Sequence, residues 1–248
     1  MMAIMDETVT SKWPALLVVM RHAESEANLR REILDNANSR DPHVGLPVRD
    51  VDVELTEQGR WQAGEAGRHL NDRFPPFDVV YVSPYHRTRH TADLVIEEMN
   101  HRPRCVIEER LREKEFGILE GLTRHGIHKF HPEEEERKKK VGKYYYRPPG
   151  GESYPDVNLR VHSFIGTMVR EHAGERILVV THSVVVLCFR RLLERMVETE
   201  VLELDRTDEV KNASLLVYRV GSRDGLHGVL NRIEWNLAPW ESVRKAGR

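Results

Sequence analysis

Residues 15–20 form an unbroken apolar run, Ala-Leu-Leu-Val-Val-Met, and Arg21 and His22 follow it at once. A run of this length with β-branched residues predicts a buried central strand. Two charged or titratable side chains then emerge where the strand ends, with a turn and a helix start behind them. Strand and helix signals alternate along the rest of the chain. This alternation favours a mostly parallel sheet with helices on both faces, which is a three-layer α/β/α sandwich.

Two further predicted strands end in the same way. Residues 177–181 are followed by His182, and residues 78–82 lead into a helix start that carries Arg87. The carboxyl ends of the strands of an open α/β sheet line the crevice where ligands bind. We therefore expect the side chains at these strand ends to form one cationic pocket, which suits a phosphoryl group.

Length and charge limit the class of protein. The 248 residues suffice for one large domain with an elaborate cap, and we predict a single domain over 1–248. The 38 basic residues nearly balance the 40 acidic ones, which argues against a nucleic-acid partner. The longest apolar run is too short and too polar to span a bilayer, and residues 1–14 lack the apolar core of an export signal. We expect a cytoplasmic protein with no membrane association, whose oligomeric state the sequence leaves open.

Two long segments depart from the alternating pattern. The polar segment at about 28–53 is longer than an ordinary connection and is predicted to be a functional flap. The periodicity also breaks down at about 120–150, which we interpret as a cap insertion; its run of acids and bases at 133–140 predicts a solvated helix. The expected helices elsewhere cover 56–71, 84–99, 153–172 and 184–196, and a hairpin at 214–220 and 228–235 closes the chain.

Short motifs occur along the chain in a fixed order. They are Arg21-His22-Ala23-Glu24-Ser25 with Asn28, Leu55-Thr56-x-x-Gly59, Ser83-Pro84-x-x-Arg87-Thr88, Glu115-Phe116-Gly117, Gly151-Glu152-Ser153 and Thr181-His182-Ser183. In combination they resemble the histidine phosphatase superfamily, in the branch that includes cofactor-dependent phosphoglycerate mutase. The resemblance extends over about 16–183. Residues 144–153 are most similar to plant and fungal mutase-like proteins of poorly defined substrate.

The resemblance implies a catalytic role for five residues. His22 would be the nucleophile that attacks phosphorus and forms a phosphohistidine, which water then hydrolyses. Arg21 and Arg87 would hold the equatorial oxygens, and His182 would add a donor from the opposite side. Glu115 would protonate the leaving group, which requires burial or nearby negative charge to raise its pKa. Two guanidinium groups neutralise the charge, so no metal and no cofactor is expected.

Other positions are weaker candidates. Asn28, Ser183 and Arg147 are candidate contacts of a small phosphorylated substrate; Ser153 is either a helix N-cap or a residue of the pocket rim. The run Tyr144-Tyr145-Tyr146 either reaches over the pocket or packs within the cap. For Glu115 a structural ion pair remains an alternative, because three more glutamates are close in sequence: Glu109, Glu113 and Glu120. The spacing of His125, His128 and His131 favours solvent-exposed residues over a metal site.

The chain departs from the family pattern at two positions. Ala23 stands where the motif usually has glycine, and Ser183 stands where glycine often follows the second histidine. A Cβ atom at either position would crowd the approach of phosphate to the backbone. We expect slower or narrower chemistry as a result.

The leading prediction is a phosphatase that hydrolyses a phosphomonoester. The first alternative is a cofactor-dependent phosphoglycerate mutase, which uses the same residues. Mutases of this family resemble one another in carrying a longer insertion between the acid and the second histidine than this chain has from Glu115 to His182. The cap of this chain is also unlike theirs. The second alternative is a catalytically weak protein that binds phosphate in the same pocket. The complete set of catalytic positions argues against this second alternative. The sequence does not identify the substrate.

Overall fold

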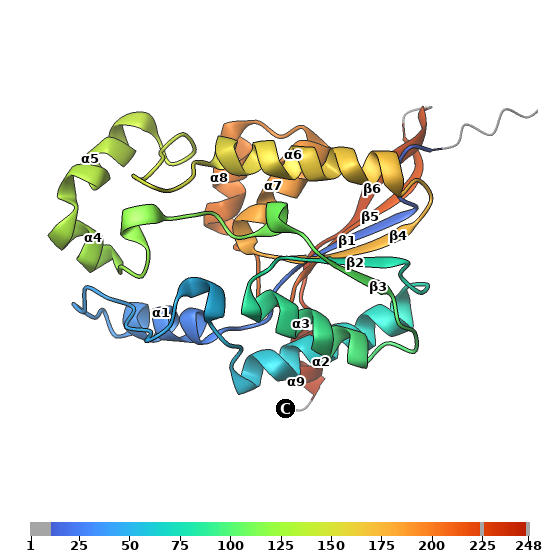
Figure 1. Ribbon diagram of the computed structural model, residues 1–248, viewed down its shortest axis with the longest axis horizontal. Coiled ribbons are helices and arrows are strands. Elements are labelled where there is room, and N and C mark those ends of the chain that lie inside the picture. Colours follow the sequence, from blue (N-terminus) through green and yellow to red (C-terminus); the bar gives the residue numbers. More distant parts are fainter. Residues whose placement is uncertain (1–10, 224–225, 247–248) are drawn as a thin grey trace, which may run out of the picture.

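A six-stranded sheet forms the centre of the protein (Figure 1). The structure, a computed structural model, describes residues 11–223 and 226–246. Within them the strand order is β3-β2-β4-β1-β5-β6. The strands are β1 (Leu16–Arg21), β2 (Val79–Val82), β3 (Arg104–Ile107), β4 (Arg176–Thr181), β5 (Leu215–Arg223) and β6 (Leu226–Leu237). Strands β1 to β4 pair in parallel, β5 pairs antiparallel with β1, and β6 pairs antiparallel with β5, which confirms the predicted mostly parallel sheet.

Helices cover both faces of this sheet. They are α1 (Glu26–Asn36), α2 (Glu57–Arg73), α3 (His86–Glu97), α4 (Arg124–Phe130), α5 (Pro132–Val141), α6 (Tyr154–Glu171), α7 (Ser183–Glu194), α8 (Glu198–Thr207) and α9 (Pro239–Ala246). In Figure 1, α6, α7 and α8 lie above the sheet, and α2, α3 and α9 lie below it. The predicted three-layer α/β/α arrangement is confirmed. None of the described helices is long and apolar enough to cross a bilayer.

Strand β1 is buried on both faces because its side chains alternate between two cores. Leu17 and Val19 pack in one core with Phe164 of α6, whereas Val18 and Met20 pack in the other with residues of α2 and α3. This two-sided burial explains why the strand reads as a continuous apolar run rather than an alternating one. Because β1 is held between the two cores, the position of His22, the residue after its last residue Arg21, is held as well.

Local capping residues set the starts of the helices near the strand ends. Thr56 accepts a hydrogen bond from the N–H of Gly59 and caps α2, as the sequence predicts. Ser153 forms a capping box with Asp156 at the start of α6. Ser25 caps α1, and its hydroxyl lies within hydrogen-bonding distance of Asn28 at the third position of the helix.

The segment predicted as a flap is only partly irregular. Helix α1 occupies its first part as far as Asn36, and a single 3₁₀ turn, Asp50–Asp52, lies near its end. The sequence predicts the start of α1 behind His22 but not its length, and it does not predict α4, α8 or α9. Within the predicted cap, α5 confirms the expected helix at 133–140.

The flap and the cap contact each other through their backbones. The N–H of Val44 donates to the carbonyl of Gly121 (2.8 Å), and the N–H of Thr123 donates to that of Pro42 (3.1 Å). A Cβ atom on Gly126 would lie 1.9 Å from the Pro42 carbonyl oxygen, so only glycine permits this approach. The two segments, predicted separately, form one structure beyond the end of the sheet (Figure 1).

Two sequence expectations fall on parts of the chain that the structure does not describe. The expectation about an export signal concerns residues 1–14, of which 1–10 lie outside the described residues. The closing hairpin is present as β5 and β6, but Asp224 and Gly225 in its turn also lie outside them.

Candidate active site

Three neighbouring strands bring the predicted site residues together at their carboxyl ends. The N–H of His22 donates to the carbonyl of Thr181 (2.8 Å), so the chain after β1 runs beside the end of β4. The rings of His22 and His182 lie 5.2 Å apart, edge to face. Strand β2 ends beside β4 and leads to Arg87, which lies in the first turn of α3. The sheet register thus places both histidines and Arg87 at one edge.

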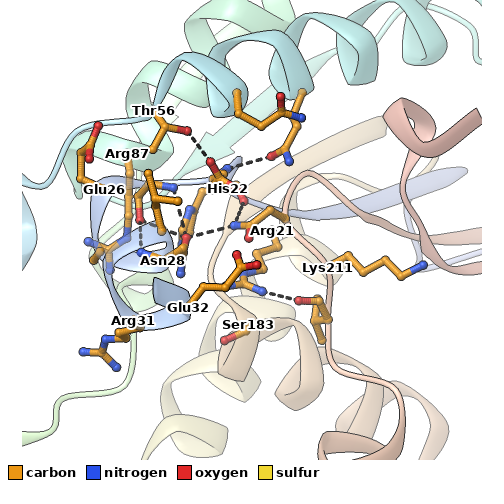
Figure 2. Close-up of a pocket in the computed structure, with 18 of the residues that line it drawn as sticks. Arg21, His22, Glu26, Asn28, Arg31, Glu32, Thr56, Arg87, Ser183 and Lys211 are labelled. Atoms are coloured by element: carbon orange, nitrogen blue, oxygen red, sulfur yellow. Dashed lines mark hydrogen bonds between the residues drawn. The ribbon is translucent and has the colours of Figure 1, made fainter. Parts of the chain in front are cut away.

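A cavity of about 1250 Å³ opens at this edge. Five of the predicted residues line it, namely Arg21, His22, Asn28, Arg87 and Ser183. Figure 2 shows these five around the cavity, with Ser183 approaching from α7. His182 is fully buried, its ring lies edge to face with that of His22, and it does not line the cavity. Glu115, Ser153 and Arg147 are also absent from the lining.

His22 is held as a neutral imidazole with one nitrogen free. Its Nδ1 lies 2.7 Å from the backbone carbonyl of Ala23, so Nδ1 carries the proton and donates it there. The lone pair of Nε2 is then available. Burial lowers the pKa of His22 well below its ordinary value, and the charges of Arg87 and Arg21 add to this effect. Near neutral pH the residue is therefore uncharged, as a nucleophile must be.

His182 is oriented by Ser83. The Ser83 hydroxyl lies 2.8 Å from Nε2 of His182 and also accepts the N–H of Tyr85 at 3.5 Å. The hydroxyl therefore donates to Nε2, which leaves the ring proton on Nδ1. That Nδ1 is buried and has no hydrogen-bond partner among the described residues. Burial also lowers the pKa of His182 well below its ordinary value.

Arg21 presents a second buried donor without a partner. One of its terminal nitrogens donates to the carbonyl of Val210. The same nitrogen lies 3.8 Å from a carboxylate oxygen of Glu209. Its Nε is buried and unpaired among the described residues. Buried polar groups normally have partners, so the unpaired donors of Arg21 and His182 indicate a site for an acceptor-rich ligand.

Arg87 is occupied by a carboxylate of this chain. Its two terminal nitrogens contact Asp50, at 2.6 Å to the backbone oxygen and at 3.3 and 3.1 Å to the two carboxylate oxygens. The guanidinium also lies 4.8 Å from the centre of the Tyr85 ring. Asp50 lines the cavity, so its side chain holds a position that an incoming anion would require. The sequence analysis did not single out this residue.

Asn28 is fixed by its carbonyl oxygen. Its Oδ1 accepts from the N–H of Ser25 (3.2 Å), the Ser25 hydroxyl (3.0 Å) and the amide of Asn212 (3.1 Å). With that oxygen engaged, the amide Nδ2 is the group that Asn28 can offer to a ligand. Asn212 lines the cavity too and also donates to the carbonyl of His22.

Glu113 and Glu120 line the cavity, whereas Glu115 does not. Glu113 lines the cavity and lies 3.5 Å from the hydroxyl of Ser183. Burial raises its pKa, against the opposing charges of Arg87 and Arg21. Glu115 is 43% exposed, pairs with Arg112 at 3.7 Å and accepts from the Tyr85 hydroxyl. It has the ion pair that the sequence analysis kept as an alternative.

A backbone anchor explains why Glu113 is the residue that faces the cavity. The hydroxyl of Thr181, the last residue of β4, donates to the carbonyl of Leu111 at 2.8 Å. This bond holds Leu111 beside the end of β4. Glu113 follows two residues later. Glu113 follows the end of β3 more closely than Glu115 does, and this nearness to a strand end is the sequence signal that favours it. The Glu115-Phe116-Gly117 motif pointed to Glu115 instead.

The remaining candidates have structural partners. Ser153 caps α6, and Arg147 is 65% exposed and bonds to the Gly151 carbonyl. Tyr144 and Tyr146 are buried, which supports packing within the cap. Ala23 is fully buried in a hydrophobic core and does not line the cavity, so its Cβ cannot crowd a ligand as expected from the sequence. The histidines at 125, 128 and 131 form no metal-type cluster in the described chain.

Comparisons with known proteins identify the family. A family model described as the histidine phosphatase superfamily (branch 1) matches residues 17–231. A 2,3-bisphosphoglycerate-dependent phosphoglycerate mutase of Methylobacterium radiotolerans is 33% identical over 210 residues, which are 84% of this chain and 90% of the relative. The corresponding mutase of Parvibaculum lavamentivorans is 30% identical over 216 residues, 86% of this chain and 94% of the relative.

Solved structures share the fold. A mycobacterial glucosyl-3-phosphoglycerate phosphatase, solved with inorganic phosphate, matches with a TM-score of 0.65 and 23% identity over 91% of this chain and 98% of its own. A putative alpha-ribazole-5'-P phosphatase of Escherichia coli matches with a TM-score of 0.68 and 22% identity over 90% of this chain and 97% of its own.

Proposed function

This chain belongs to the histidine phosphatase superfamily, and on that premise we propose that it is a phosphatase that hydrolyses a phosphomonoester through a covalent phosphohistidine on His22. The observation that carries the proposal is the neutral His22 ring with its Nε2 free, flanked by unpaired buried donors of Arg21 and His182. These are the parts that phosphoryl transfer to nitrogen requires.

In the first step, Nε2 of His22 attacks phosphorus and the bond from phosphorus to the leaving oxygen breaks. The reacting group spreads its charge over three equatorial oxygens, so the protein mainly positions and neutralises it. Nε of Arg21 and Nδ1 of His182 donate to these oxygens. Arg87 joins them once it exchanges the Asp50 carboxylate for the substrate.

The leaving oxygen takes a proton from Glu113. We assign the acid role to this residue in place of Glu115, because it lines the cavity and burial raises its pKa. In the second step the deprotonated Glu113 accepts a proton from water, whose oxygen attacks the phosphohistidine. Inorganic phosphate leaves, and both residues return to their starting states.

The charge of the cavity lining supports hydrolysis over the mutase reaction. The lining contains nine acidic residues against five basic ones. Three of the acids, Glu26, Glu32 and Asp35 on α1, make no ion pair with any described residue. A bisphosphoglycerate carries a carboxylate and two phosphoryl groups, so these acids repel it more strongly than a substrate with a single phosphoryl group. The size of the cavity, about 1250 Å³, is also above the range of about 300–1,000 Å³ typical of sites that enclose a small ligand.

Phosphoglycerate mutase activity is the second candidate function. The two relatives described above carry that name, and the mutase reaction would use the same His22 and Arg87. The two activities differ in the fate of the phosphohistidine. A mutase transfers the phosphoryl group from the histidine to a phosphoglycerate, whereas a phosphatase transfers it to water.

One experiment tests both. Phosphate release from p-nitrophenyl phosphate and from a panel of phosphorylated metabolites is measured beside the interconversion of 3- and 2-phosphoglycerate with 2,3-bisphosphoglycerate added. We expect phosphate release to exceed isomerisation, and His22→Ala to abolish it while circular dichroism stays unchanged. Equal phosphate release by the wild type and His22→Ala would defeat the proposal. Faster isomerisation than hydrolysis would favour the mutase.

A further inference from the structure

A cluster of metal-ligating side chains lies beside the cavity, on the outer surface of α3. His86 and His90 are one helical turn apart on this helix and therefore share a face. Glu54, from the segment between the 3₁₀ turn at Asp50–Asp52 and helix α2, faces them. Within the described residues, one ligand atom from each of the three lies within 4.8 Å of the others.

The spacing of these atoms suits a tetrahedral ion. Oε2 of Glu54 lies 3.2 Å from Nδ1 of His86 and 3.7 Å from Nδ1 of His90. Tetrahedral zinc with bonds of about 2.0–2.1 Å requires its ligand atoms to be about 3.4 Å apart. These two distances bracket that separation, and the three ligand atoms all lie within 4.8 Å of one another. Two histidines at i and i+4 on one helix are a recurrent zinc-binding arrangement.

The donor atom of His90 has no other role among the described residues. Its Nδ1 is buried from solvent and has no hydrogen-bond partner there. The opposite nitrogen, Nε2, lies 2.9 Å from a guanidinium nitrogen of Arg60, which donates to it. A neutral imidazole that accepts a hydrogen bond at Nε2 carries its proton on Nδ1, and a protonated Nδ1 cannot bind a metal. The hydrogen bond from Arg60 therefore competes with metal binding at Nδ1 of His90. Arg60 is 40% exposed and can swing away from the ring.

We propose that Glu54, His86 and His90 bind one divalent transition-metal ion of the zinc type. Water completes its coordination, and Arg60 leaves Nε2 of His90 as the ion binds. The ligand set of two imidazoles and one carboxylate selects zinc over magnesium or calcium, which prefer oxygen ligands. This site lies outside the reaction proposed for His22, which needs no metal.

The ion would tie a wall of the cavity to α3. Glu54 is four residues from Asp50, and His86 precedes Arg87 directly. The carbonyl of Glu54 also accepts the N–H of Glu26 at the start of α1 (3.0 Å). A metal at this position therefore links the segment that carries Asp50 to the helix that carries Arg87.

Metal binding can be measured directly. The tag-free, chelator-treated protein is titrated with Zn²⁺ in competition with a chromophoric chelator, and its melting temperature is recorded with and without the ion. We expect one bound ion per chain and a higher melting temperature, with no effect of Mg²⁺ or Ca²⁺. His86→Ala and His90→Ala each weaken binding at least about tenfold, since even outer-shell partners of a metal contribute that much.

Two further variants make the test specific. His128→Ala, which removes an exposed histidine paired with Glu135, leaves the affinity unchanged and serves as the control. Arg60→Ala removes the competing donor and strengthens binding. Binding that survives both His86→Ala and His90→Ala, or an affinity in Arg60→Ala no higher than in the wild type, would overturn the assigned ligand set.

Discussion

The carboxylate of Asp50 lies 3.1 Å from a terminal nitrogen of Arg87, inside the cavity that also contains His22. Arg87 is almost fully buried, and Asp50 is its partner from the end of the flap. A planar guanidinium binds a carboxylate and a phosphoryl group through the same pair of donors. In the proposed reaction, the substrate therefore has to displace this carboxylate before Arg87 can bind the phosphoryl group.

Removal of that carboxylate should strengthen phosphate binding. Asp50→Asn keeps the size of the side chain and removes its charge, and we expect the inhibition constant for inorganic phosphate to fall about five- to tenfold, or ~1 kcal/mol. Asp52→Asn is the matched control, because Asp52 pairs with the exposed Arg49. An unchanged or higher inhibition constant in Asp50→Asn would show that Asp50 orients Arg87 rather than competing for it.

The choice between two glutamates can be made with leaving groups of different acidity. Glu113→Gln should lower kcat/KM about 10²–10⁴-fold for an alkyl phosphate, because the alkoxide then leaves without a proton. The loss in kcat/KM, which does not include the hydrolysis of the phosphohistidine, should be much smaller for p-nitrophenyl phosphate, whose leaving group is stable as an anion. Glu115→Gln is the control and should stay within about twofold of the wild type, since exposed, ion-paired carboxylates contribute little. The reverse ranking would return the acid role to Glu115.

The activity should depend on pH through the same two residues. His22 reacts when neutral, and its pKa is lowered below 6.5, so the rate should rise with pH at a point below that value. Glu113 acts when protonated, and its pKa is raised above 4.5, so the rate should fall as pH rises through that higher pKa. The profile of kcat/KM is thus bell-shaped. In Glu113→Gln the fall at higher pH should disappear; if it persists, another group causes it.

A pair of glycines in α2 tests the packing of the layer below the sheet. A Cβ atom on Gly67 would lie 2.7 Å from the Val95 carbonyl of α3, so Gly67→Ala should destabilise the protein by about 1–3 kcal/mol. Gly64 lies in the same helix, and its added Cβ would meet nothing closer than 3.5 Å. Gly64→Ala should stabilise by about 0.5–1 kcal/mol. Urea unfolding measures both, and equal effects would contradict the tight α2–α3 contact.

The sequence predicts the sheet well because its signals are local. The apolar run at 15–20 and the change to Arg21 and His22 depend on neighbouring residues alone, and β1 ends where the pattern changes. The strand ends that carry His182 and lead to Arg87 follow the same logic. Parallel strands buried on both faces have few other ways to pack.

The parts that the sequence could not predict depend on distant contacts. Glu113 and Glu115 differ by two residues in an irregular stretch, and the bond from Thr181 to Leu111 decides which one faces the cavity. Asp50 is one of many acids in a polar segment, and only the fold brings it to Arg87. The flap also contains α1, of which the sequence indicates only the start behind His22.

The backbone bonds between residues 42–44 and 121–123 bear on how such proteins diversify. A chimaera that received another relative's cap but retained this flap would lose partners for the Val44 N–H and the Pro42 carbonyl, and would have to place a glycine against Pro42 again. Exchange of both segments together avoids that mismatch. An engineered exchange should therefore treat these two stretches of sequence as one module.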